Sequence, residues 1–283
     1  MPCSPAKRRR RLAAAALVLL GALLAGAGPA PEPIRWRELR PGLELAFLEN
    51  VASTRSGSAR VALLRVDPAR YSFRVLAAPA GQAGLTAEQW REASGALAVF
   101  NAGQYTAERK YLGHLMQDGK TLSRPVAQQD GLFLAEPTDP GLPPARVIDQ
   151  RYTAYDPASS PYRQAAQSLM LVDRFGQVRV RRSNRVAFRT AVAEDEQGRI
   201  LVMVTEGGHT LWELAHALLA SGLGLREVMS MDGGPESQLD IKTDKFRYQQ
   251  FGRAQGSPDL SWLRQPLPAA LAILPRELKS GKP

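Results

Sequence analysis

The order of apolar and polar residues along the chain predicts many short strands. Apolar and polar residues alternate at 44–48 and 60–66, as on strands with one buried face, and the other strands are short apolar runs bounded by turn residues. The predicted strands are 44–48, 60–66, 72–78, 96–100, 111–117, 131–134, 168–172, 177–180, 186–193, 200–205, 227–231 and 270–274.

Two helices have clear start signals. Thr86 with Gln89 and Thr210 with Glu213 each form a capping box, in which side chains of the first turn satisfy backbone N–H groups. These signals predict helices at 86–94 and 211–221. Many strands and few helices predict an α+β fold, as a single domain with a mixed β-sheet.

The strands at 200–205 and 227–231, with the helix between them, predict a C-terminal βαβ unit. Parallel strands joined in this way end at the same edge of a sheet, which is where open sheets bind ligands. Glu206 and Asp232 follow these two strands, so we expect them to lie side by side. The alternative is that Asp232 and the two glycines after it form an ordinary hairpin turn, since Asp-Gly between apolar runs is also a turn signal.

The N-terminus has the pattern of a secretory signal peptide. Five basic residues at 7–11 precede an apolar run at 12–25, and Ala25-Gly26-Ala27 offers a small-x-small cleavage site. The run is short for a membrane span, so an uncleaved anchor is the less favoured alternative. The predicted organisation is a signal peptide at 1–27, a leader at 28–40 and a folded domain at 41–283.

Composition narrows the class of protein. The chain has 37 basic and 27 acidic residues, but five of the basic ones lie in the predicted signal peptide, which leaves 32 against 27. No basic helix with interleaved aromatic residues indicates a nucleic-acid partner. The only cysteine, Cys3, would be removed with the signal peptide, so the domain must be stable without disulfides. We therefore predict a periplasmic or secreted protein with no stable membrane insertion after cleavage.

Glycines and polar residues gather where predicted strands end. The segments are Asn101-Ala102-Gly103 with Gly113 and Asp118-Gly119-Lys120, then Gln167-Ser168, Arg189-Thr190-Ala191, Glu206-Gly207 and Met231-Asp232-Gly233-Gly234-Pro235-Glu236-Ser237. Their order and spacing resemble the phosphodiester glycosidase family over about 61–274, and are most similar to a bacterial subgroup. Two residue pairs depart from the family pattern: Pro235-Glu236 follows Asp-Gly-Gly, and Leu169-Met170 follows Gln-Ser.

The resemblance implies hydrolysis of a sugar-1-phosphodiester. This reaction develops positive charge at the anomeric carbon while a phosphate leaves, so carboxylates suit the sugar and a guanidinium suits the phosphate. Asp232 and Glu206 are the predicted catalytic carboxylates, and Arg189 is predicted to bind the phosphate. The other predicted substrate-binding residues are Asn101, Gly103, Gly207, His209, Gly233, Gly234 and Ser237.

Each of these candidates has a structural alternative. Asp232 could cap its glycine turn, and Glu206 could be a solvated residue at a strand end. Arg189 could pair with an interior carboxylate. Asn101 could be a turn former, and His209 could be a helix-start residue whose ring faces water.

The remaining motifs predict neither a metal nor a cofactor. The three histidines are too scattered for a zinc site, and the sequence has no P-loop, dinucleotide-binding or Gly-x-Ser-x-Gly motif. The sequence therefore predicts an envelope hydrolase whose substrate is a sugar phosphodiester or a related cell-envelope glycan linkage. The alternative is a non-catalytic periplasmic carbohydrate-binding protein with the same fold.

Overall fold

The computed structural model describes residues 33–51, 57–254 and 264–276. The predicted signal peptide, its cleavage site and the first residues of the leader lie outside the described residues. Within the described ranges, no helix is long and apolar enough to cross a membrane.

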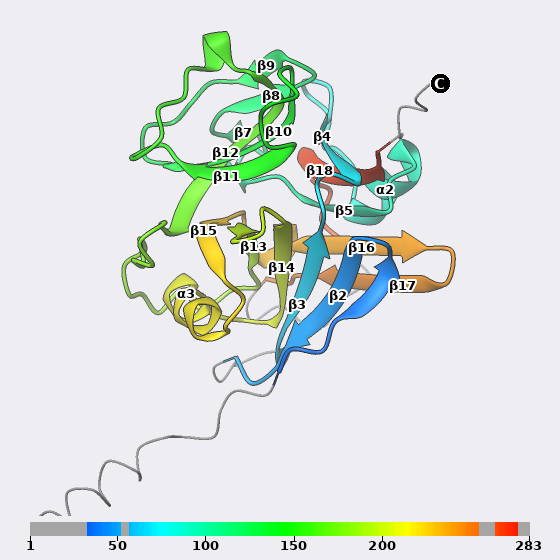
Figure 1. Cartoon of the computed structure of the whole chain (residues 1–283), viewed down its shortest axis with the longest axis vertical. Coiled ribbons are helices and arrows are strands. Elements are labelled where there is room, and N and C mark those ends of the chain that lie inside the picture. The colour runs from blue at the N-terminus through cyan, green and yellow to red at the C-terminus, as the bar shows by residue number, and fades with distance from the viewer. Residues whose placement is uncertain (1–32, 52–56, 255–263, 277–283) are drawn as a thin grey trace, which may run out of the picture. The chain divides into compact units, whose positions relative to one another are not determined.

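Two β-sheets make up most of the described chain (Figure 1). The larger sheet has the strand order β1 (Arg37–Arg40), β2 (Leu43–Leu48), β3 (Gly57–Val66), β14 (Ile200–Gly207), β13 (Thr190–Asp195), β15 (Leu225–Ser230), β12 (Tyr162–Val172), β10 (Gly131–Pro137) and β11 (Ala145–Asp149). β8 (Leu115–Gln117) also pairs with β12, and β9 (Lys120–Ser123) pairs with β8. The smaller sheet has the order β17 (Phe246–Phe251), β16 (Gln238–Thr243), β5 (Ala98–Asn101), β18 (Ala269–Pro275) and β4 (Tyr71–Ala77). A separate ribbon is formed by β6 (Gln104–Tyr105) and β7 (Tyr111–Leu112).

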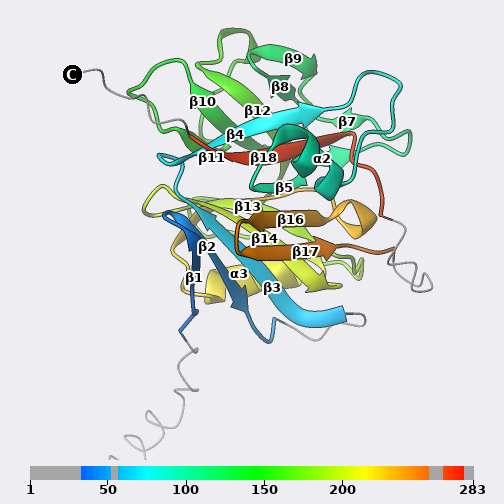
Figure 2. The same cartoon turned by 90° about the vertical axis from the view of Figure 1, so that its right-hand side faces the viewer.

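The two α-helices of the described residues begin where the capping boxes predict. They are α2 (Ala87–Ser94), which follows Thr86, and α3 (Leu211–Ala220), which follows Thr210. Each threonine side chain accepts a hydrogen bond from the backbone N–H three residues on. α2 packs on the smaller sheet and α3 on the larger one (Figure 2). The structure also has two short 3₁₀ turns, η1 (Pro157–Ser159) and η2 (Gly234–Glu236).

The main hydrophobic core lies between the two sheets. Val202 and Val204 of β14 face this core, together with Phe100 of β5 and Leu271 of β18. Met203, between the two valines, faces the opposite side and packs in the core that α3 covers. Successive side chains of a strand point to opposite faces, so the position of a residue along a strand decides which core it enters.

The predicted mixed sheet is wrong, because every pairing between described strands is antiparallel. The predicted C-terminal βαβ unit is not confirmed either. Its two strands and its helix are present as β14, α3 and β15, but β13 lies between the strands and pairs antiparallel with both. β14 and β15 therefore point in the same direction without being neighbours. The broad α+β class agrees with the structure.

Six of the described strands escaped prediction: β1, β6, β9, β11, β16 and β17. β16 carries Asp240 and Lys242, which weaken its apolar pattern. The reason for a carboxylate at position 240 becomes visible only in the folded structure. Asp240 is fully buried and accepts a hydrogen bond of 2.8 Å from Nε of Arg91 in α2. The predicted hairpin at 168–180 is only partly present, since Val172 and Val178 form an isolated bridge.

Candidate active site

A cavity of about 400 Å³ opens where β15 ends. Three segments line it: the β6 ribbon and the residues after it, the 180–189 segment that leads into β13, and the 230–236 segment that follows β15. Its polar lining residues are Gln104, Tyr105, Thr106, Arg181, Ser183, Arg185, Arg189, Ser230, Asp232 and Glu236. The cavity therefore combines two carboxylates with three guanidinium groups.

Asp232 is fixed in this cavity by backbone groups. Its Oδ1 accepts a hydrogen bond of 2.9 Å from the N–H of Gly233, and its Oδ2 accepts one of 3.0 Å from the N–H of Tyr105. The backbone of Asp232 is held as well, because its N–H donates to the carbonyl of Gly103 and its carbonyl accepts from Nδ2 of Asn101, both at 3.0 Å. The carboxylate thus has one orientation, set by β5, β6 and the turn after β15.

Burial raises the pKa of the Asp232 carboxyl above its ordinary value. The N–H groups of Gly233 and Tyr105 oppose this rise, and the charges of Arg185 and Arg189 oppose it further, but burial has the larger effect. Asp232 is therefore a stronger base than an ordinary exposed aspartate while still being stabilised as an anion by its neighbours.

Arg189 is a buried cation at the wall of the cavity. Its Nε donates to the carbonyl of His209 at 2.9 Å, and its Nη2 donates to the carbonyl of Arg185 at 2.7 Å. No carboxylate lies within ion-pair distance of it in the described part of the chain, so the interior ion pair that was one sequence-based alternative is not formed. Burial, and next the nearby charge of Arg185, lower its pKa to about 10, while Asp232 opposes the shift. A buried guanidinium whose hydrogen-bond acceptors in the described chain are carbonyls, with no ion pair, favours an anionic ligand.

Glu236 is a second carboxylate in the cavity and was not among the predicted site residues. It lies in η2, four residues after Asp232, and one of its carboxylate oxygens is 3.6 Å from Nη1 of Arg109. Burial raises its pKa, and the negative charge of Asp232 raises it further. The only sequence signal was the Pro235-Glu236 departure from the family pattern, which marks the same turn.

Several other predicted residues support the cavity. Gly233 and Gly234 line it, and a side chain on Gly233 would meet the carbonyl of Phe188 at 2.6 Å. Asn101 and Gly103 hold the backbone of Asp232, as described above, without lining the cavity. Ser237 lies outside the lining as well, where its buried hydroxyl is 2.9 Å from the hydroxyl of Thr190.

Glu206 lies apart from Asp232, contrary to the predicted side-by-side arrangement. Arg60 donates two hydrogen bonds to its carboxylate, at 2.8 and 2.9 Å, and the hydroxyl of Tyr248 donates a third at 2.8 Å. Burial tends to raise the pKa of Glu206, but these hydrogen bonds outweigh burial and lower it. The reason for its position is alternation along β14: Glu206 continues the Val202 and Val204 face, toward β17. Gly207, the last residue of β14, does not line the cavity either.

His209 is fully buried, and neither of its ring nitrogens has a hydrogen-bond partner among the described residues. Its contribution to the site is its carbonyl, which accepts from Arg189. Burial lowers the pKa of its imidazole. The negative charge of Glu213 opposes this shift, and the positive charge of Arg189 adds to it. The ring does not face water, so that alternative for His209 is wrong.

We expect His209→Leu to make the protein more resistant to acid. The buried imidazole has a lowered pKa, so below its ordinary pKa of 6.5 the unfolded chain takes up the proton more readily and stability falls. Leucine removes this proton uptake and the two unpartnered nitrogens, whose burial costs about 1–3 kcal/mol. Urea unfolding at about pH 8 and about pH 5 measures the effect. His216→Leu, at an exposed position of α3, is the matched control, and an equal loss of stability at about pH 5 in wild type and His209→Leu would contradict the expectation.

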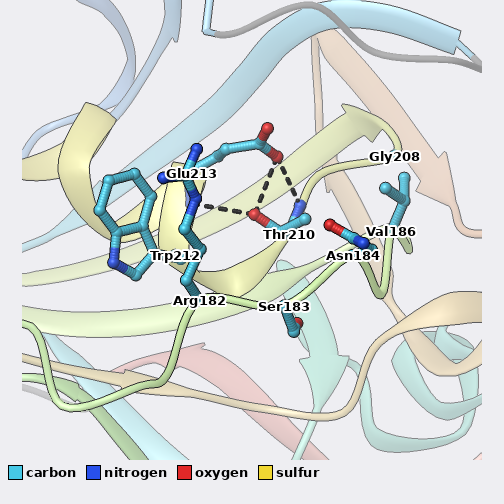
Figure 3. Close-up of a pocket in the computed structure, with 8 residues that line it drawn as sticks. All are labelled: Arg182, Ser183, Asn184, Val186, Gly208, Thr210, Trp212 and Glu213. Atoms are coloured by element: carbon cyan, nitrogen blue, oxygen red, sulfur yellow. Dashed lines mark hydrogen bonds between the residues drawn. The ribbon is translucent and has the colours of Figure 1, made fainter.

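A neighbouring cavity of about 360 Å³ lies at the start of α3 (Figure 3). Its wall contains the capping box, in which a carboxylate oxygen of Glu213 accepts hydrogen bonds from the N–H and the hydroxyl of Thr210, both at 2.9 Å. The guanidinium of Arg182 lies 5.1 Å from the ring centre of Trp212. Glu213 thus already occupies the helix N-terminus, so this cavity is less suited to an anion than the one that contains Arg189.

Solved structures share this fold. The catalytic domain of zebrafish N-acetylglucosamine-1-phosphodiester alpha-N-acetylglucosaminidase, auto-inhibited by its pro-peptide, matches with a TM-score of 0.60 and 16% identity over 86% of this chain and 88% of that chain. A hypothetical protein from Synechocystis matches with a TM-score of 0.55 and 13% identity over 89% of this chain and 65% of that chain. No curated protein matches the sequence. The family model for phosphodiester glycosidases matches residues 94–274, which is more than half of the chain, and the chain therefore belongs to the phosphodiester glycosidase family.

Proposed function

We propose that the protein is an envelope hydrolase that cleaves a sugar-1-phosphodiester or a related polysaccharide linkage in the cavity at the end of β15. The observation that carries this proposal is that one cavity contains both Arg189, a buried cation with no ion pair to a described residue, and Asp232, a carboxylate held by two backbone N–H groups. Membership of the phosphodiester glycosidase family supports the same reaction class. So does the fold shared with the zebrafish enzyme, whose name gives an N-acetylglucosamine-1-phosphodiester as its substrate.

In this proposal the phosphate lies against the arginine wall of the cavity. Arg189 is fixed through Nε and Nη2 by two carbonyls, which leaves Nη1 without a hydrogen bond to a described residue. Arg185 and Arg181 are exposed side chains on the same wall and add positive charge without ion pairs of their own in the described part of the chain. Guanidinium groups suit a phosphate because their planar N–H donors match its oxygens.

Asp232 is the proposed base or nucleophile at the sugar. In hydrolysis the bond between the anomeric carbon and the phosphate oxygen breaks, and its electron pair leaves with the phosphate. The oxygen of water ends on the anomeric carbon, and a carboxylate takes up the proton that this water loses. Phosphate is a good leaving group, so its stabilisation by Arg189 can replace much of the protonation that other glycosidases need. Glu236 takes the place that the sequence analysis assigned to Glu206 as the second carboxylate.

A panel of sugar-1-phosphodiesters tests this function directly. The purified mature protein is expected to release free sugar and a phosphate monoester from at least one member. A protein that binds a member of the panel but hydrolyses none would instead support the carbohydrate-binding alternative.

The pH at which kcat/KM falls on the acidic side is expected to depend on the positive charge of Arg185. Asp232 must be ionised to act as base or nucleophile, so kcat/KM falls as the pH drops through its pKa. Arg185 lowers that pKa, and Arg185→Ala therefore moves this acidic limb to higher pH. Arg182→Ala is the matched control, because Arg182 is an exposed arginine on the same segment that faces the cavity of Figure 3 instead. Identical acidic limbs in wild type and Arg185→Ala would contradict the assignment of Asp232.

We further propose that the protein acts in the periplasm or outside the cell. The basic residues at 7–11, the short apolar run after them and Ala25-Gly26-Ala27 support this proposal. A Burkholderia pseudomallei protein labelled as exported shares the fold, with a TM-score of 0.50 and 12% identity over 76% of this chain and 74% of that chain.

The mature protein is expected to begin near Gly28. Mass spectrometry of the protein recovered from the periplasm or the medium measures this end. A chain with an intact N-terminus, retained in the inner membrane, would show that the segment is an anchor instead.

A further inference from the structure

A larger cavity of about 650 Å³ lies on the other side of the β6–β7 ribbon. We call it the β7–β9 groove, because residues of β7, β8 and β9 line it together with 77–82, 109–110 and 268–269. Tyr105 of β6 lines the candidate active site, and Tyr111, its partner across the ribbon, lines the groove. One two-stranded ribbon is therefore the wall between the two cavities.

The described wall of the groove carries positive charge. Arg109, Lys110 and Lys120 line it, and among the described residues no aspartate or glutamate does. Neither lysine has an ion pair within the described ranges. Asp118 is close in sequence, but it accepts a hydrogen bond from Gln164 instead, at 2.8 Å. Glu108 is exposed and outside the lining, although it lies near Lys110. The groove therefore favours an anionic ligand.

The groove is also apolar along much of its length. Leu122 remains 42% exposed and lines it together with Pro79, which follows β4, and Pro268, which precedes the neighbouring strand β18. Leu115 forms a buried part of the wall. Ligand cavities of this size are mostly apolar with a few charged groups that set orientation. The lining thus fits a ligand with both an apolar segment and a negative charge.

Arg109 connects the groove to the candidate active site. Its side chain lines the groove, its Nη1 lies 3.6 Å from the Glu236 carboxylate of the neighbouring cavity, and its Nη2 donates to the carbonyl of Pro266. Its backbone has a φ of 60°, a conformation that non-glycine residues seldom adopt and that functional sites often contain. A ligand that extends from Glu236 past Arg109 enters the groove.

We propose that the β7–β9 groove binds the aglycone of the phosphodiester substrate, and that this aglycone carries an apolar segment and a further negative charge. This inference rests on the proposed hydrolase function. In that arrangement the sugar and the phosphate occupy the cavity of Asp232 and Arg189, and the group esterified to the phosphate passes Arg109 and lies between Leu122 and the two lysines. The groove then selects the substrate by its aglycone, independently of the sugar.

Two phosphodiesters of the same sugar test the proposal, one with a methyl aglycone and one with a carboxyoctyl aglycone. In the double variant Lys110→Ala/Lys120→Ala, KM for the carboxyoctyl ester is expected to rise about fivefold, from two lost ionic contacts of up to about 0.5 kcal/mol each. Its kcat and both constants for the methyl ester are expected to stay unchanged. Lys242→Ala/Lys245→Ala, at two exposed lysines of the β16–β17 hairpin, is the matched control. Equal changes for both esters, or the same KM change for a neutral octyl ester, would overturn the proposal.

A binding measurement separates this inference from the proposed function. Hydroxynonanoate, the free aglycone of the long ester, contains no sugar or phosphate and needs no turnover. Calorimetry is expected to show that it binds the wild-type protein and the Lys242→Ala/Lys245→Ala control alike, and binds Lys110→Ala/Lys120→Ala about fivefold more weakly. This result would support the groove even if no ester were hydrolysed. Absence of binding to the wild type, or equal binding to the Lys110→Ala/Lys120→Ala variant, would overturn the groove assignment whatever the activity.

Discussion

Asp232→Asn is expected to lower kcat at least about 100-fold while ligand affinity changes little. The amide keeps the size of the side chain but is neither base nor nucleophile, so the loss falls on the transition state. A factor of about 100 is the lower end for a missing general acid or base. Steady-state kinetics on the best substrate of the panel, with calorimetry of the same ligand, measures both effects. Wild-type turnover in a folded Asp232→Asn protein would remove Asp232 from catalysis.

The stability of Asp232→Asn shows whether the loss is chemical. An amide offers one oxygen where the carboxylate offers two, so one of the N–H groups of Gly233 and Tyr105 loses its acceptor, at a cost of about 1–3 kcal/mol. The raised pKa of Asp232 means that its ionised form is unfavourable in the folded protein, and a neutral amide removes this cost. These effects oppose each other, so we expect Tm to stay within about 4 °C of wild type.

Glu206→Gln is the matched control for this experiment. Glu206 is the other carboxylate predicted to be catalytic, but Arg60 and Tyr248 hold it outside the cavity that Asp232 lines. We therefore expect its substitution to leave kcat within about threefold of wild type, a difference of about 0.7 kcal/mol in activation free energy. A loss as large as that of Asp232→Asn would restore Glu206 to the reaction.

The sequence predicts elements best where the signal is local. The capping boxes at Thr86 and Thr210 need only four consecutive residues, and both helices start where those residues stand. Strand positions from β2 to β5 follow from short apolar runs in the same way. Pairing is different, because it depends on strands that are distant in sequence: nothing between 200 and 231 shows that β13 inserts between β14 and β15. A helix between two strands indicates that they run in the same direction, but not that they are neighbours.

The same limit explains the two carboxylates. Asp232 became a candidate because its glycine turn is visible in the sequence, and in the structure that turn lines the cavity. Glu206 also stands beside a glycine at a strand end, yet alternation along β14 directs its side chain toward β17. Glu236 has no such local signal. It is a candidate through its burial and the nearby charge of Asp232, whose carboxylate is held by Tyr105 of β6, more than 120 residues away in sequence.

Arg189→Ala is expected to weaken binding as well as rate, because the guanidinium would contact the phosphate in the substrate and in the transition state alike. A hydrogen bond to a charged group contributes about 1.5–3 kcal/mol, so we expect a loss of about 10- to 100-fold in affinity for a phosphodiester ligand. Arg189→Lys keeps the charge but not the planar arrangement of donors that the carbonyls of His209 and Arg185 orient, and we expect an intermediate loss. Calorimetric titration of each variant with the same ligand gives the ranking.

Arg60→Ala separates this effect from a general loss of positive charge. Arg60 is an arginine of the larger sheet that forms an ion pair with Glu206 and does not line the cavity. Its removal is expected to leave phosphodiester affinity unchanged. Thermal unfolding identifies variants that fail to fold, since Arg189 also ties the 185–189 segment to His209. If Arg189→Lys binds the ligand as the wild type does, charge alone is sufficient and the oriented donors are not needed. If Arg189→Ala does so with its fold intact, the phosphate does not lie against this wall of the cavity, and the assignment of Arg189 is wrong.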